Sequence, residues 1–83
     1  MIKILFFASL KEQLSAGTLD YPASKQLTVS ELIDQLGETE DPSWRNVLNA
    51  EDILVAVNQI IVPRDFMVAP GNEVAFFPPV TGG

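Results

Sequence analysis

The chain has 83 residues, which leaves room for one domain only. It is 47% hydrophobic and 19% charged, a composition typical of folded globular proteins rather than disordered ones. It contains no cysteine and no histidine, which excludes disulfides, thiol nucleophiles, Cys/His zinc sites and triads with a histidine base. Because no apolar run is long enough to span a bilayer and no signal-peptide pattern opens the chain, we expect a soluble cytoplasmic protein without membrane contact.

The net charge of −6 comes from one part of the chain. Residues 31–52 hold seven acidic residues against Arg45 alone, whereas four acids and four bases balance elsewhere. No basic stripe is present to neutralise phosphates, so nucleic acid is not an expected partner. The simplest interpretation of the acidic stretch is a solubilising surface, and the alternative is a surface that steers a basic partner.

The first elements are expected to be a strand, a short helix and a second strand. Residues 2–8 are rich in β-branched and aromatic side chains, which predicts a strand. Ser9 and Glu12 have the spacing of a capping box, which predicts a short helix that ends at Gly17. The alternation of residues 18–22 predicts a second strand at the edge of the sheet.

The strongest helix pattern covers residues 29–36. Thr28 and Glu31 have capping-box spacing at its start, and Gly37 follows as its expected end. Its apolar residues recur at i, i+3, i+4 and i+7, the period of one helix face: Val29, Leu32, Ile33 and Leu36. That face is expected to pack on a sheet.

A third helix and three strands are expected in the second half of the chain. Asp41 and Pro42 predict an N-cap followed by the first helical position, with an apolar face from Trp44, Val47 and Leu48. Residues 53–58 form a near-continuous apolar run, typical of a strand covered on both faces. The remaining elements are a turn at 58–59, a short strand at 60–62, turns at 63–65 and 69–72, and a last strand at 73–77 that Pro78 and Pro79 stop.

This order predicts an α+β fold in which a small mixed sheet is packed on one face by a main helix. We expect a domain of residues 1–77 and an extended tail of residues 78–83. The helix face of 29–36 is expected to be buried against these strand residues: Ile4, Phe6, Val55, Val57, Val74 and Phe76.

The C-terminus is the first feature that indicates function. A Gly82–Gly83 end packs no side chain and is entropically costly to order, so it has little structural use. It does offer a backbone without Cβ atoms whose carboxylate can enter a narrow channel. Six extended residues reach up to about 20 Å, enough to enter the active site of another protein. The alternative is an inert tail.

The second feature is the sheet face that the main helix does not cover. Strand alternation places Phe7, Ile61 and Phe77 together on that face. Exposed apolar clusters with a polar rim commonly mark protein interfaces. The alternative is that a loop or the short third helix covers this face.

Three stretches resemble the family of molybdopterin synthase small subunits, which are ubiquitin-like β-grasp sulfur carriers: residues 2–8, 56–59 and 72–83. The resemblance extends over the whole chain and is weakest in residues 38–52. It implies a ubiquitin-like β-grasp fold and a role in molybdenum cofactor biosynthesis. A ubiquitin-activating-like adenylyltransferase would use ATP to adenylate Gly83, and sulfur would then replace the adenylate to give a thiocarboxylate. The large subunit of a heterotetrameric synthase would use that sulfur to build the dithiolene of molybdopterin from cyclic pyranopterin monophosphate.

The resemblance also implies how the roles are divided. The chain would not be an enzyme on its own, since the catalytic residues would lie mainly on the large subunit, and it would hold neither metal nor cofactor. Gly83 would be the reacting residue, and the partner-binding residues would be Phe7, Ile61, Phe77, Pro78, Pro79, Val80, Thr81 and Gly82. Three alternatives remain: a thiamine-pathway sulfur carrier, a ubiquitin-like protein modifier, and an interaction module with an inert tail.

Overall fold

The computed structural model describes residues 1–79. The described elements, in chain order, are β1 (Ile2–Phe6), α1 (Ser9–Gln13), β2 (Thr18–Tyr21), β3 (Leu27–Thr28), α2 (Val29–Thr39), α3 (Ser43–Leu48), β4 (Leu54–Val57), β5 (Ile60–Ile61), β6 (Met67–Val68) and β7 (Glu73–Phe77).

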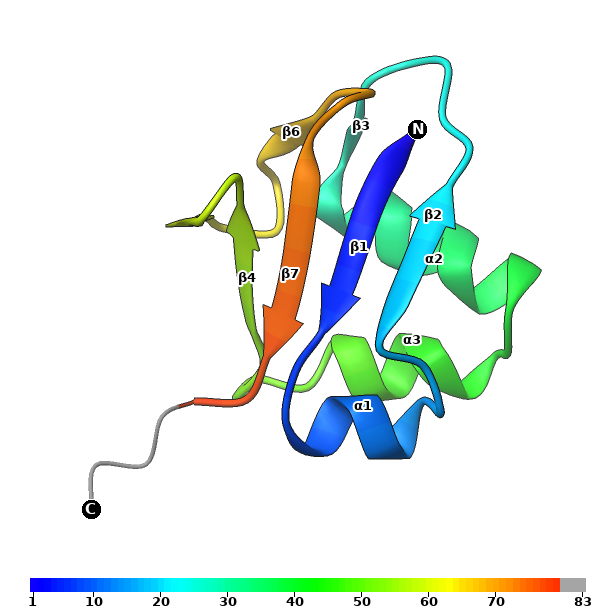
Figure 1. Ribbon diagram of the computed structural model, residues 1–83, viewed down its shortest axis with the longest axis vertical. Helices are drawn as coiled ribbons and strands as arrows, with labels where there is room; N and C mark the ends of the chain where they lie inside the picture. Colours follow the sequence, from blue (N-terminus) through cyan, green and yellow to red (C-terminus); the bar gives the residue numbers. More distant parts are fainter. Residues whose placement is uncertain (80–83) are drawn as a thin grey trace.

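Five of the strands form a mixed sheet in the order β2-β1-β7-β4-β5. β1 and β7 are parallel neighbours at its centre, and the other pairs are antiparallel. Figure 1 shows α2 and α3 together on one side of this sheet, with α1 at the end where β1 finishes. This is the α+β, β-grasp arrangement that the sequence predicts.

The expected packing between the main helix and the sheet is confirmed. The predicted residues of α2 and of the central strands are all buried in one cluster. Within it, the ring of Phe6 stacks on Phe76 with centroids 5.8 Å apart, and Trp44 meets Phe6 edge-on at 5.3 Å. Such aromatic pairs add stabilisation beyond their burial, so α3 is joined to the centre of the sheet through Trp44.

The capping box at the start of α2 is confirmed, but its predicted end is wrong. The Glu31 backbone N–H donates to Thr28 Oγ1 at 3.0 Å, and the Thr28 N–H donates to Glu31 Oε1 at 2.8 Å. α2 continues through Gly37, which is buried. A Cβ on Gly37 would lie 2.5 Å from Arg45 Cγ, so this glycine admits the Arg45 side chain of α3. Arg45 in turn donates to the Asp34 carbonyl at 3.0 Å.

The predicted boundaries of α1 are also wrong. The helix begins at Ser9 itself, Ala8 is the N-cap residue, and no side-chain capping bond forms. α1 ends at Gln13, and Ser15 rather than Gly17 takes the positive φ that follows. The reason is the tight turn after β1, in which the Leu10 N–H donates to the Phe7 carbonyl at 3.2 Å and directs Leu10 into the core.

α3 begins one residue later than predicted, at Ser43. The Asp41 carboxylate still closes its first turn, because it accepts the Ser43 hydroxyl at 2.7 Å and the Ser43 backbone N–H at 2.8 Å. These bonds, the hydroxyl bond first, lower the pKa of Asp41 below its ordinary value. Trp44 and Leu48 are buried as predicted.

The short second sheet was not predicted. β3 and β6 have two residues each, with Leu27 opposite Val68 and Thr28 opposite Met67. Two residues are too short to show an alternation, so the sequence pattern could not reveal this pair. The other connections follow the prediction: 58–59 and 69–72 are turns, and β5 is one residue shorter than expected.

Candidate partner-binding site

No helix within residues 1–79 lies over one side of the five-stranded sheet, and we call this side the open face (Figure 1). Its apolar residues are set by strand register, because paired residues in neighbouring strands point to the same side. Ala56 lies opposite both Ala75 and Ile61, and Leu5 lies opposite Ala75 on the other side of β7. The apolar residues of the open face are therefore Leu5, Phe7, Leu54, Ala56, Ile61, Ala75 and Phe77.

The structure brings the three predicted residues to this face. Phe7 follows β1 directly, and its N–H donates to the Phe76 carbonyl at 3.1 Å, so the parallel register continues and places Phe7 beside Phe77. Phe7 is 48% exposed, Ile61 is 63% exposed, and Phe77 is half-buried. The alternative that α3 covers the face is wrong, since α3 lies on the other side with α2 (Figure 1).

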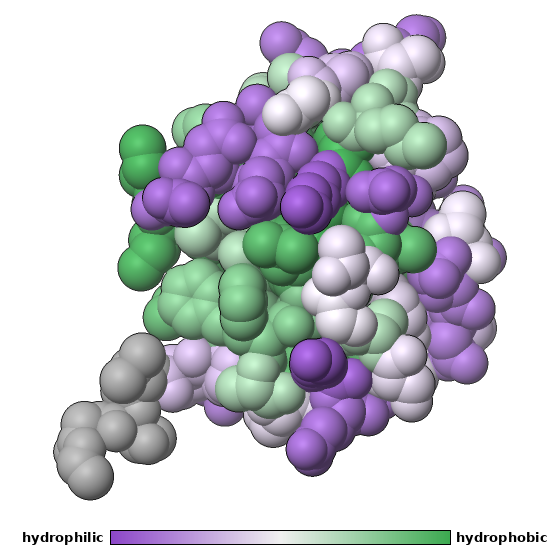
Figure 2. Space-filling view, in the orientation of Figure 1, coloured by the Kyte–Doolittle hydropathy of each residue, from purple (hydrophilic) through white to green (hydrophobic). Residues whose placement is uncertain are grey.

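Figure 2 views this face and shows an apolar area over the sheet, bounded above by a band of hydrophilic side chains. The strand register also gives a polar row across the open face, in which Lys3 lies opposite both Asp20 and Glu73. An apolar patch with a polar rim is the pattern of a protein–protein interface.

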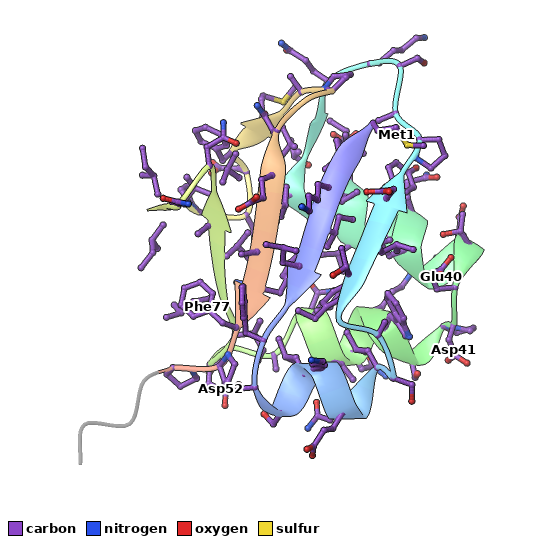
Figure 3. The ribbon with its side chains drawn as sticks, viewed as in Figure 1. Met1, Glu40, Asp41, Asp52 and Phe77 are labelled. Carbon is purple, nitrogen blue, oxygen red and sulfur yellow. The ribbon has the colours of Figure 1, made fainter. Side chains whose placement is uncertain are left out.

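The last strand, β7, ends at the apolar edge of this face. β7 ends at Phe77, opposite Leu54. Pro78 is partly buried and Pro79 is exposed. Figure 3 shows Phe77 where the chain leaves the sheet, with Asp52 nearby. Four of the predicted site residues, Val80, Thr81, Gly82 and Gly83, lie outside the described residues.

Among residues 1–79, no group of three or more acidic, histidine or cysteine side chains could hold a metal ion. The pKa of Asp41 is lowered by its bonds to Ser43, a role that belongs to the start of α3. Within the same residues, no helix is both long and apolar enough to cross a membrane.

Sequence reasoning missed part of the open face. Leu5 and Ala75 were visible in the alternation with Phe7 and Phe77, because they lie two residues earlier in the same strands. Leu54 could be found only from its pairing with Phe77, a contact between strands far apart in the sequence.

Comparison with known proteins gives consistent matches over the full chain. Residues 4–83 match the model of the ThiS family. The chain is 41% identical to the molybdopterin synthase sulfur carrier subunit of Escherichia coli, over 100% of both chains. It is 31% identical to the Mycobacterium tuberculosis protein of the same name, over 99% of this chain and 96% of that one.

Solved structures agree on the fold. SAMP1 from Haloferax volcanii has a TM-score of 0.79 and 26% identity, covering 99% of this chain and 98% of that one. A complex of subunits 1 and 2 of the molybdopterin-converting factor of Helicobacter pylori includes a chain with a TM-score of 0.64 and 19% identity, covering 99% and 97% respectively. The chain therefore belongs to the ThiS family, together with the molybdopterin synthase sulfur carrier subunits that it matches from end to end.

Proposed function

We propose that this protein is the sulfur carrier subunit of molybdopterin synthase. The observation that carries the proposal is the 41% identity to a carrier subunit of that name over the whole of both chains. The geometry supports it, because β7 ends at the rim of an exposed apolar face. A carrier needs a presented terminus and a docking surface, and the chemistry can then come from its partners.

In the proposed reaction sequence the Gly83 carboxylate attacks the α-phosphate of ATP, which forms an acyl adenylate and releases pyrophosphate. A sulfur donor at the oxidation level of sulfide then attacks the acyl carbon and displaces AMP, leaving a thiocarboxylate. In the synthase this sulfur passes to cyclic pyranopterin monophosphate, and an oxygen from water returns to the Gly83 carbonyl carbon. Two such transfers supply both sulfur atoms of the dithiolene.

The proposed partners are the large subunit of molybdopterin synthase and an adenylyltransferase related to ubiquitin-activating enzymes. The open face suits a protein partner, because its exposed aromatic and aliphatic side chains adjoin the point where the chain leaves the sheet. The similar Helicobacter pylori fold was solved as a complex of two subunits, which supports a large-subunit partner. We propose that Pro78, Pro79, Val80, Thr81 and Gly82 contact the partner on the approach to its active site.

Intact mass spectrometry tests this proposal. The full chain is incubated with the adenylyltransferase, ATP and a sulfur donor. We expect a mass gain equal to the exchange of one oxygen for sulfur, located in the last peptide. The variant lacking Gly83 should gain nothing. Loading that persists without Gly83, or that appears on another residue, would contradict the carrier mechanism.

A second candidate is a ubiquitin-like modifier. It is favoured by the similarity to SAMP1 and to a second Haloferax volcanii structure, which is described as small archaeal modifier protein 1. A modifier would form isopeptide bonds from Gly83 to lysines of other proteins. The two functions separate in a reconstituted synthase: a carrier yields molybdopterin and regains its carboxylate, whereas a modifier yields higher-mass conjugates. A thiamine-pathway carrier would acquire the thiocarboxylate but would not support molybdopterin formation.

A further inference from the structure

Asn58 and Gln59 make the turn between β4 and β5 in a backbone conformation that is unfavourable for glutamine. Asn58 has φ 50° and Gln59 has φ 70°. Positive φ at both central residues of a two-residue hairpin is the geometry of a type I′ turn, in which asparagine followed by glycine is strongly preferred. Asn58 fits its position, but a glutamine at the second position carries the steric cost of a Cβ in the left-handed region.

Asn58 has a clear structural role in this turn. Its side-chain Oδ1 accepts the Glu73 backbone N–H at 2.9 Å, and its own backbone N–H donates to the Glu73 carbonyl at 2.8 Å. These two bonds close the end of the sheet between β4 and β7. The side chain of Asn58 therefore offsets the cost of its conformation within the molecule.

The side chain of Gln59 makes no such bond to offset the cost of its own positive φ. Its side chain is exposed and makes no hydrogen bond to any other residue within 1–79. With Asn58 and Glu73 it lines a shallow depression of about 220 Å³. Glu73 belongs to the polar row of the open face, so this depression lies at the rim of the apolar patch. Gln59 itself is two residues before Ile61, a residue of that patch. Strained backbone conformations cluster at functional sites, and no side-chain hydrogen bond within residues 1–79 offsets the strain at Gln59.

We propose that Gln59 is a partner-contact residue, whose amide and the Glu73 carboxylate together receive a hydrogen-bond donor of the large synthase subunit. This inference rests on the proposed function, since it takes the large subunit as the partner. The two side chains offer acceptor oxygens in one depression, which suits a backbone N–H or a basic side chain. A fixed hydrogen-bonding point at the polar rim would set the orientation in which the apolar patch docks.

Three variants separate the amide from the backbone strain. Gln59→Ala removes the amide and keeps the strained conformation, whereas Gln59→Gly removes both. Ser15→Gly is the matched control, because Ser15 is also an exposed residue at positive φ (53°). Ser15 leads into β2, at the opposite edge of the sheet from β5.

Calorimetric titration of the full chain with the large subunit, together with thermal unfolding, tests the proposal. We expect both Gln59 variants to bind about 5- to 10-fold more weakly, as for the loss of one hydrogen bond. Both glycine variants should unfold about 4 °C higher, because glycine relieves the strained backbone conformation. Ser15→Gly should bind as the original chain does.

The proposal is overturned if Gln59→Ala and Gln59→Gly bind with unchanged affinity, or if Gln59→Gly fails to raise the unfolding temperature. An equal loss of affinity in Ser15→Gly would also overturn it, since the effect would then come from the backbone in general. Failure of the proposed function looks different: the unsubstituted chain would itself show no binding to the large subunit, and the assignment of Gln59 to that partner would fall with it.

Discussion

At the scale of single residues, Ala8 has a backbone conformation that is unfavourable for an alanine. Its φ of 55° and ψ of −132° belong to a region that glycine enters readily and residues with a Cβ avoid. Ala8 is exposed, so its methyl group gains nothing in the core. The turn from β1 into α1 imposes this conformation, because it must place Leu10 inside while β1 remains in register.

We therefore expect Ala8→Gly to stabilise the fold by about 1 kcal/mol, since it relieves the conformation at some cost in unfolded-state entropy. Chemical denaturation measures this change. Ala16→Gly is the control: Ala16 packs against the core without a positive φ, so the same substitution there should reduce stability. Equal effects at both positions would show that Ala8 is not strained.

Leu32 tests the core assignment at the same scale. It is fully buried on the face of α2 that packs against the sheet. Leu32→Ala should lower the free energy of unfolding by about 2–5 kcal/mol, the cost of a cavity in a close-packed core. Ser30→Ala, on the exposed side of the same helix, should change it little. A small effect at Leu32 on urea denaturation would remove it from the core.

At the scale of elements, α2 is the helix whose start the sequence predicts most clearly. Both reciprocal bonds of the capping box between Thr28 and Glu31 are present. Its far end is decided by packing, because Arg45 of α3 crosses over Gly37 and pairs with Asp34 and Glu38 at 3.7 and 3.8 Å. Gly37 therefore lets the Arg45 side chain of α3 approach α2 closely, and it does not end the helix.

Removing the cap gives the element-scale prediction. Thr28→Ala should destabilise the protein by about 1 kcal/mol, the usual cost of losing an N-cap side chain. Thr39→Ala is a matched control, because Thr39 Oγ1 bonds back to the Gln35 carbonyl at the other end of the same helix, an interaction of little net value. Thermal unfolding of both variants should show a shift for Thr28 alone. Equal shifts would mean that the cap contributes nothing specific.

At the scale of the whole molecule, the two sides of the sheet have different tasks. One side is buried under α2 and α3 and holds the fold together. The other exposes an apolar patch next to the end of β7. Exposed aromatic side chains contribute little to the stability of the free subunit but are typical anchors of protein interfaces.

Replacing Phe7, Ile61 and Phe77 together by alanine should therefore weaken binding to the large subunit by at least about 2 kcal/mol, while the fold persists. Phe66→Ala is the control: this phenylalanine is 40% exposed, and its carbonyl accepts the Val29 N–H at the start of α2, away from the open face. Calorimetry measures binding, and circular dichroism checks the fold. Unchanged affinity in the triple variant would place the interface elsewhere.

The sequence by itself determined the order of the main elements, the helix face that packs on the sheet, and the alternation that sends Phe7, Ile61 and Phe77 to one side. These depend on local periodicity, which is complete within a few neighbouring residues. Tertiary structure alone decided where α1 and α2 end, that β3 pairs with β6, and that Leu54 joins Phe77 on the open face. Each of these depends on contacts between residues distant in the chain, where close packing and register override local propensity.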